Sequence, residues 1–147
     1  REPEKSADLS IVEEVAEADL RPGRTAEIIR YPWGSTAVAQ QLMEAKVLLA
    51  ERATTRFFGV RVDGEIVSWS DLYVAQAVGQ VEDVATKEAH RGNGYATAVV
   101  LRAAREARAE GADLVFLVAD GDDWPKELYS KLGFDTVGRL TKFFLTG

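Results

Sequence analysis

The chain has 147 residues, of which 46% are hydrophobic and 29% are charged, with a formal net charge of −6 and a pI near 4.9. This length and balance predict a single soluble globular domain with its own core, and the acidic charge argues against nucleic-acid binding, which favours a basic face. The chain has no cysteine, which excludes disulfides, thiolate zinc sites and a cysteine nucleophile, and its single histidine makes a metal site unexpected.

The N-terminal residues suggest how the domain begins. No apolar run approaches the ~18 residues of a membrane helix, and no secretory leader is recognisable, so we expect a cytoplasmic protein with no membrane partner. The first residue is Arg1 rather than Met, which suggests a part of a longer product. Residues 1–8 are polar and charged, and they predict a flexible tail before one domain over residues 9–147.

The first third of the chain contains few strong signals for regular structure. Residues 9–15 fit either a strand or a helix, and Arg21-Pro22-Gly23 predicts a break. Residues 31–34 predict a loop. Ser35 suits the N-cap of a helix over residues 36–52, where apolar side chains recur at helical spacing.

The middle of the chain has the periodicity of β-strands. Residues 56–62 and 65–73 predict two strands joined by a tight turn at Asp63-Gly64. Residues 76–79 interrupt the pattern, and residues 81–86 predict the next strand.

The C-terminal part alternates helices and strands. Residues 97–110 carry small apolar side chains on one face, which predicts a helix ending at Gly111. The apolar run at residues 114–119 predicts a strand covered on both faces, so the two strands flanking the helix are expected to form a right-handed parallel crossover. Residues 125–132 predict a short helix, and residues 135–145 predict a final strand.

The most informative stretch is His90-Arg91-Gly92-Asn93-Gly94-Tyr95-Ala96-Thr97. It joins a strand to a helix, so several backbone N–H groups at the positive end of the helix dipole are available to an anion. Arg91 adds a guanidinium suited to phosphate. A dinucleotide fingerprint would need glycine where Thr97 stands, and a P-loop would need lysine directly after Gly94, so both interpretations are weak.

Two motifs in this sequence resemble those of one family. Arg91-x-x-Gly94-x-Ala96 is similar to the acyl-coenzyme A pyrophosphate loop of the GNAT acetyltransferases, and residues 128–134, Leu-Tyr-Ser-Lys-Leu-Gly-Phe, resemble their late helix-and-turn signature. The resemblance covers residues 56–145. It implies an α/β (α+β) fold, with a mixed, mostly antiparallel sheet flanked by helices and a parallel β-α-β crossover at the cofactor site.

The resemblance also implies a reaction. Acetyl-CoA would donate its acetyl group to a primary amine by direct attack, without a metal, and the acceptor would be a small-molecule or peptide amine. The alternative is a non-catalytic or degenerate CoA-binding regulatory module. The oligomeric state is left open, with a homodimer among the candidates.

Residue roles carry over from the family motif by motif. Pantetheine would pair with the backbone of Val84, Ala85 and Thr86. Tyr129 would lie near the thioester sulfur, also contacting the cofactor, and would protonate the departing thiolate, although a plain core tyrosine is the alternative. The pyrophosphate would be held by the loop residues Arg91, Gly92, Asn93, Gly94, Tyr95 and Ala96.

The general base is less clearly indicated. Glu82 and Asp83 lie on the strand before the loop, and strand alternation predicts that their side chains point to opposite faces, so that at most one faces the acceptor. Glu82 is the favoured base, with Asp83 and water alone as alternatives. His90 is expected beside the phosphate loop without a catalytic role.

Two further observations concern the rest of the site. Asp122 stands where the family commonly has an asparagine that contacts the cofactor, which puts that contact in doubt, and it instead suits a helix cap. Four aromatic residues could line an acceptor pocket, although a core position is favoured for each one: Tyr31, Trp33, Trp69 and Tyr73.

Overall fold

The computed structural model describes residues 2–119 and 125–141. The chain divides into two compact units: a larger one, residues 6–118, and a smaller one that contains the described residues before and after it. The tail over residues 1–8 and the single domain over residues 9–147 stay predictions.

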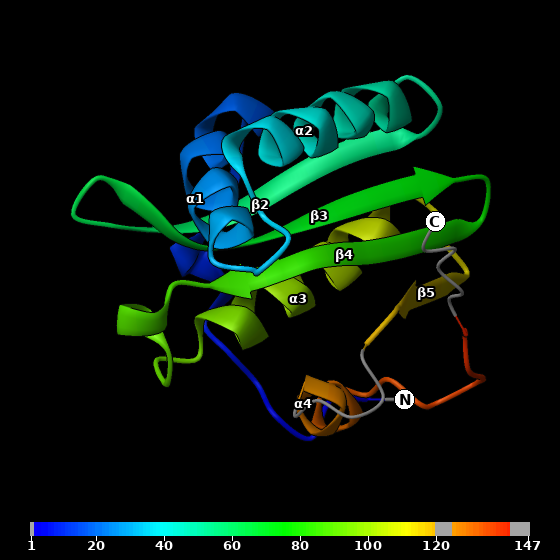
Figure 1. Cartoon of the computed structure of the whole chain (residues 1–147). Coiled ribbons are helices and arrows are strands. Elements are labelled where there is room, and N and C mark those ends of the chain that lie inside the picture. Colours follow the sequence, from blue (N-terminus) through cyan, green and yellow to red (C-terminus); the bar gives the residue numbers. More distant parts are fainter. Residues whose placement is uncertain (1, 120–124, 142–147) are drawn as a thin grey trace. The chain divides into compact units, whose positions relative to one another are not determined.

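The larger unit is built on a five-stranded sheet in the order β1-β2-β3-β4-β5. Figure 1 labels β2 to β5 of this sheet. The first four strands pair antiparallel with their neighbours in the chain, and the last pairs parallel with β4, as the sequence predicts. Asp63 and Gly64 form the turn between β2 and β3 with positive φ angles of 49° and 83°. The strands are β1 (Val12–Val15), β2 (Thr54–Val62), β3 (Glu65–Ala75), β4 (Val78–Thr86) and β5 (Leu114–Leu117).

Helices cover both faces of this sheet (Figure 1). α3 (Tyr95–Ala109) packs against β3 and β4 on one face, and α1 (Glu17–Ile29) and α2 (Thr36–Ala50) pack together on the other. α3 connects β4 to the parallel β5, which is the predicted crossover. Val99, Val100 and Ala103 of α3 are completely buried, so the apolar face seen in the sequence is the face that covers the sheet.

α1 runs through the predicted break at Arg21-Pro22-Gly23. A proline inside a helix costs about 3 kcal/mol because its nitrogen cannot donate a hydrogen bond, so the helix needs compensation from packing. The buried side chains of Leu20 and Arg24 provide it. Gly23 allows close approach to the sheet, because a Cβ there would lie 3.0 Å from the Trp69 ring. Tertiary burial therefore outweighs the local break signal.

Other boundaries refine the predictions. Residues 9–15 form a short 3₁₀ helix, Leu9–Ile11, followed by β1. Ser35 caps α2 as predicted, since its Oγ accepts a hydrogen bond from the Val38 N–H at 3.2 Å, and α2 ends at Ala50. The prediction that residues 114–119 are covered on both faces is wrong. Among the described strands β5 lies at the edge of the sheet; it ends at Leu117 and leaves Leu114 53% exposed.

The smaller unit contains α4 (Pro125–Lys131), which confirms the predicted helix. Gly133, with φ 92°, ends it, and the Phe134 N–H donates to the Tyr129 carbonyl at 3.0 Å. The predicted strand at residues 135–145 is wrong for residues 135–141, which form no strand, and residues 142–145 lie outside the described residues. Val137 is 91% exposed, and a strand needs a paired neighbour that sequence alternation does not provide.

The N-terminal segment of the smaller unit has no helix or strand from residue 2 to residue 5. The N–H groups of Glu4 and Lys5 donate to the Lys131 carbonyl, at 2.8 and 3.3 Å. Across both units, none of the helices in the described ranges has the length and apolar character needed to span a membrane.

We expect Gly79→Ala to destabilise the protein by about 1–3 kcal/mol, because overpacking a closed core costs that much. A Cβ at Gly79 would lie 2.8 Å from the Ala107 Cβ on α3, where neither group can rotate away. Urea denaturation measures the change. Gly138→Ala is the control, with nothing within 4 Å of its new Cβ, and should change stability by less than about 0.5 kcal/mol. Equal losses in the two variants would contradict the close packing of β4 on α3.

Candidate active site

The pairing between β4 and β5 ends near the middle of β4. Their pairing ends at Val81 opposite Leu117. Beyond that point β3 is the only described strand that pairs with β4, through Glu82, Ala85 and Thr86. The backbone edge of β4 that faces away from β3 is therefore available to another extended group over this segment.

A β-bulge lies at the point where the two strands separate. Glu82 pairs with Asp71 and Ala85 pairs with Trp69, so Asp83 and Val84 lie opposite a single β3 residue. Asp83 has a positive φ of 53°, which is unusual for a residue with a side chain. The bulge leaves Asp83 and Val84 without register partners on β3.

The glycine loop follows directly from this strand. Gly92 and Gly94 have φ angles of 81° and 79°, and Gly94 begins α3 without a side-chain cap. A Cβ at either glycine would meet nothing within 4 Å, so the loop surface is open. The first N–H groups of α3, from Tyr95 onward, lack intrahelical partners and lie at the positive end of the helix dipole. This arrangement suits an anion such as pyrophosphate.

Side chains in the loop support its conformation. The Asn93 Nδ2 donates to the His90 carbonyl at 3.0 Å, which holds the turn closed. The Arg91 Nε donates to the Thr86 carbonyl at 3.3 Å, while the residue as a whole remains exposed. The structure thus joins the predicted cofactor residues of β4, the loop and the start of α3 in one continuous stretch.

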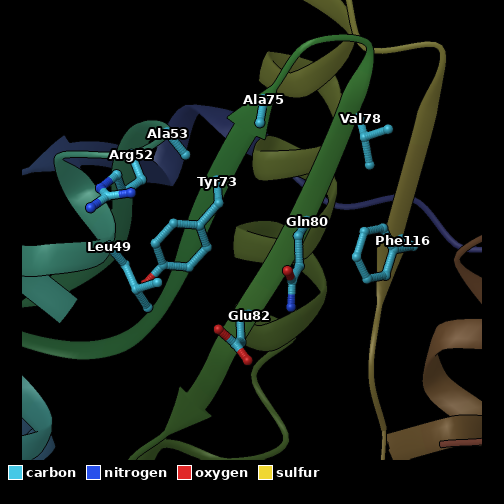
Figure 2. A pocket seen from close by; sticks show the side chains of 9 residues that line it. All are labelled: Leu49, Arg52, Ala53, Tyr73, Ala75, Val78, Gln80, Glu82 and Phe116. Atoms are coloured by element: carbon cyan, nitrogen blue, oxygen red, sulfur yellow. The ribbon is translucent and has the colours of Figure 1, made fainter. Parts of the chain in front are cut away.

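Glu82 and Asp83 lie on the same face of the sheet, so the prediction that they point to opposite faces is wrong. Asp83 accepts a hydrogen bond from the Arg24 Nε at 2.7 Å, on the α1 side. Glu82 lines a pocket on that same side together with Tyr73 (Figure 2). The physical reason is the bulge, which interrupts the two-residue alternation on which the prediction relied.

One of these two carboxylates, Asp83, belongs to a buried ionic cluster. The cluster joins Arg24 of α1, Lys46 of α2, Asp71 of β3 and Asp83 of β4. Arg24 contacts Asp71 as well as Asp83. The side chains of Arg24 and Asp71 are only 2% and 0% exposed. The Lys46 Nζ lies 2.8 Å from Asp71 and 3.4 Å from Asp83. Sequence analysis missed this cluster because its hydrogen-bonded pairs are 25 to 59 residues apart in the chain and form no motif.

The cluster determines which carboxylate is available for chemistry. Burial raises the pKa of the Asp71 carboxyl, and the nearby Arg24 and Lys46 charges act against that rise. Burial, followed by the negative charge of Asp71, raises the pKa of the Tyr73 hydroxyl far above its ordinary value, so Tyr73 stays protonated and donates to Asp71 at 3.0 Å. Within the described residues Glu82 has no ion pair, which leaves its carboxylate available in the pocket.

The pocket beside Glu82 has a volume of about 350 Å³. It lies between the C-terminal end of α2 and strands β3, β4 and β5 (Figure 2). Gln80 and Glu82 are its polar residues on the sheet, and Arg52 lies at the edge that follows α2. Its other walls are mainly apolar and include Leu49, Tyr73, Ala75, Val78 and Phe116.

The four aromatic candidates fall into three environments. Trp69 is buried in the core, as favoured, and Tyr73 lines the pocket. The core position favoured for Tyr31 and Trp33 is wrong. Their rings stack with centroids 4.9 Å apart, and both remain exposed in the loop between α1 and α2, where stacking covers only one face of each ring.

Two predicted positions, Tyr129 and Asp122, do not belong to this run of the chain. Tyr129 lies on α4 in the smaller unit, where its ring meets the Phe134 ring edge-on at 6.5 Å. Its role toward the thioester remains a prediction. Asp122 lies outside the described residues. In the ranges that the structure describes, no three His, Asp or Glu side chains gather closely enough to hold a metal ion.

Comparison with known proteins agrees with this architecture. Residues 16–134 match the model of the acetyltransferase (GNAT) family, so the chain belongs to that family. No curated protein sequence matches it.

Solved structures share the fold across nearly their whole length. An acetyltransferase from Trypanosoma brucei has 23% identity and a TM-score of 0.68, covering 91% of this chain and 98% of the relative. Glucosamine-6-phosphate N-acetyltransferase from Arabidopsis thaliana has 15% identity and a TM-score of 0.67, covering 90% and 97%. Ribosomal-protein-alanine N-acetyltransferase from Brucella melitensis biovar Abortus 2308 has 19% identity and a TM-score of 0.67, covering 91% and 99%. At these identities the likeness establishes the fold alone.

We expect Arg24→Ala to lower the free energy of unfolding by about 3–5 kcal/mol, because removing one partner of a buried pair leaves charges without compensation. Arg21→Ala on the same helix is the matched control. Arg21 pairs with Glu17 at 2.7 Å, but its side chain is 52% exposed, so the loss should be at most about 1 kcal/mol. Urea unfolding of both variants checks the difference, and a loss below about 1 kcal/mol for Arg24→Ala would contradict the structural role of the cluster.

Proposed function

We propose that this chain transfers the acetyl group of acetyl-CoA to a primary amine by direct attack. Family membership supports acetyl transfer in general. The observation that carries the specific proposal is the β4 segment from Glu82 to Thr86, which is unpaired on its β5 side and runs directly into an open glycine loop at the start of α3. One continuous stretch thereby offers a strand edge, an anion site and a carboxylate.

The residues present suit the donor. The backbone of Val84, Ala85 and Thr86, which has no partner on β5, can pair with the amide groups of pantetheine in the manner of an added strand. The loop N–H groups and Arg91 suit the pyrophosphate, since both glycines leave the backbone accessible. The two sets lie in the order in which a pantetheine arm and a pyrophosphate follow each other along coenzyme A.

The chain then supplies groups for the chemistry. The Glu82 carboxylate accepts a proton from the attacking amine, directly or through water, while the nitrogen–carbon bond forms and the carbon–sulfur bond breaks. The Val84 N–H, which has no register partner on β3, stabilises the developing oxyanion. Tyr129 returns a proton to the thiolate. With no cysteine in the chain, an acyl-thioester on a protein sulfur is ruled out, which supports direct transfer.

The relatives do not indicate which amine is the acceptor. The names of two of them describe a sugar amine and a protein alanine as acceptors, which shows how different the acceptors on this fold are. The cytoplasmic location and the homodimer stay predictions.

The test is thiol release from acetyl-CoA in the presence of a panel of primary amines, followed with a thiol-reactive dye. We expect Glu82→Gln to reduce kcat/KM by about 10²–10⁴-fold, the usual contribution of a positioned acid or base. Acetyl-CoA affinity, measured by calorimetry, should be unchanged. Glu44→Gln, an exposed carboxylate on α2 outside the pocket, is the control and should retain full activity.

Two outcomes would count against the proposal. Acetyl-CoA binding without thiol release for any amine would favour a non-catalytic CoA-binding module. Wild-type activity in Glu82→Gln would leave the transfer reaction intact but remove Glu82 as its base.

The donor loop has its own test. We expect Gly94→Ala to weaken acetyl-CoA binding at least about tenfold, which corresponds to about 1.4 kcal/mol, because a Cβ would intrude on the surface proposed for pyrophosphate. Gly111→Ala is the control. Gly111 has a comparable φ of 91° and equally open surroundings at the other end of α3, so backbone strain is matched. Equal affinities in the two variants would contradict the assignment of the loop.

A further inference from the structure

We infer that the pocket beside Glu82 holds the body of the acceptor, and that this acceptor is a monoamine carried on an apolar alkyl or aryl group. The inference rests on the proposed function, because it takes Glu82 as the carboxylate that meets the amine. It adds the chemical class of the acceptor, which neither the family nor the relatives determine.

The walls of the pocket are the first argument. They come from four elements: Leu49 at the end of α2, Tyr73 and Ala75 on β3, Val78 on β4 and Phe116 on β5 (Figure 2). These side chains present methyl groups and aromatic rings. The Tyr73 hydroxyl is already committed to Asp71, so its ring contributes as an apolar wall. A volume of about 350 Å³ is within the range of small-molecule sites.

The charges around the pocket are the second argument. Arg24 and Lys46 are matched by Asp71 and Asp83, so the buried cluster offers no unpaired cation to the pocket. Glu82 is left as the carboxylate in the lining, with no ion pair among the described residues. A single alkylammonium group would form the ion pair that Glu82 lacks, before the amine loses its proton.

The opposite edge of the pocket limits the acceptor further. Arg52 follows α2 there and, in the part of the chain that the structure describes, makes no ion pair. A second ammonium group at that end, as in a polyamine, would meet a like charge. A sugar amine would place several hydroxyls against walls that offer few hydrogen-bond partners, and each unpaired hydroxyl would oppose binding. An acceptor with one amine and an apolar body avoids both the like charge at Arg52 and the unpaired hydroxyls.

The experiment is a series of n-alkylamines from ethylamine to octylamine, whose amino groups have the same intrinsic reactivity. Thiol release from acetyl-CoA gives kcat/KM for each amine. We expect kcat/KM to rise by up to about fourfold per methylene until the pocket is filled, as burial of each CH₂ in an apolar site implies. Ethanolamine and spermidine should be poorer acceptors than propylamine and hexylamine, respectively.

Two variants locate the effect. Ala75→Phe places a ring inside the pocket from an exposed position at the end of β3, so it should shorten the chain length at which kcat/KM stops rising. Ala77→Phe, in the adjoining turn and outside the lining, is the control and should leave the series as in the wild type. Hexylamine added without acetyl-CoA should shift the NMR amide signals of Ala75, Val78 and Phe116, which reports binding independently of turnover.

The outcomes separate the two proposals. A flat or falling series, or a preference for spermidine or ethanolamine, with thiol release intact, would overturn the apolar acceptor and leave the transferase standing. Amide shifts at the pocket without thiol release for any amine would overturn the transferase and leave an apolar amine-binding pocket. A series unchanged by Ala75→Phe would show that the body of the acceptor lies elsewhere and would overturn the inference.

Discussion

The ion pairs of Arg24 connect α1 to the centre of the sheet, and much of the site depends on them. Charges taken out of water must stay paired, so Arg24, Asp71, Asp83 and Lys46 hold one another in place. This arrangement keeps α1 and α2 against β3 and anchors the bulge of β4. Its cations also pair with the carboxylates of Asp71 and Asp83, so Glu82 remains as the carboxylate available for the proposed reaction.

The bulge links structure to the proposed reaction. It brings Glu82 and Asp83 to one face, removes the register partners of Val84, and lies where β4 leaves β5. A regular strand would have kept its neighbour and turned one carboxylate toward α3. The backbone irregularity is thus what opens a strand edge beside a carboxylate, and the ionic cluster offsets its conformational cost.

The two substrates of the proposed reaction meet surfaces built in different ways. The donor surface is a single run of chain, from the free end of β4 through the glycine loop to the start of α3. The acceptor pocket is assembled from α2, β3, β4 and β5, which lie far apart in sequence. Members of one family can therefore share a donor site while differing in their acceptors, since the pocket varies with the packing of several elements.

The sequence by itself determined the hairpin of β2 and β3, the crossover helix, the glycine loop and the family, because these depend on local periodicity, turn residues and contiguous motifs. It could not foresee that α1 passes through Pro22, that residues 135–141 form no strand, or that Glu82 and Asp83 share a face. Only the tertiary structure decided these points and assembled the Arg24 cluster and the pocket. Each depends on burial or pairing between distant residues, whose free energy exceeds the local preferences that a sequence displays.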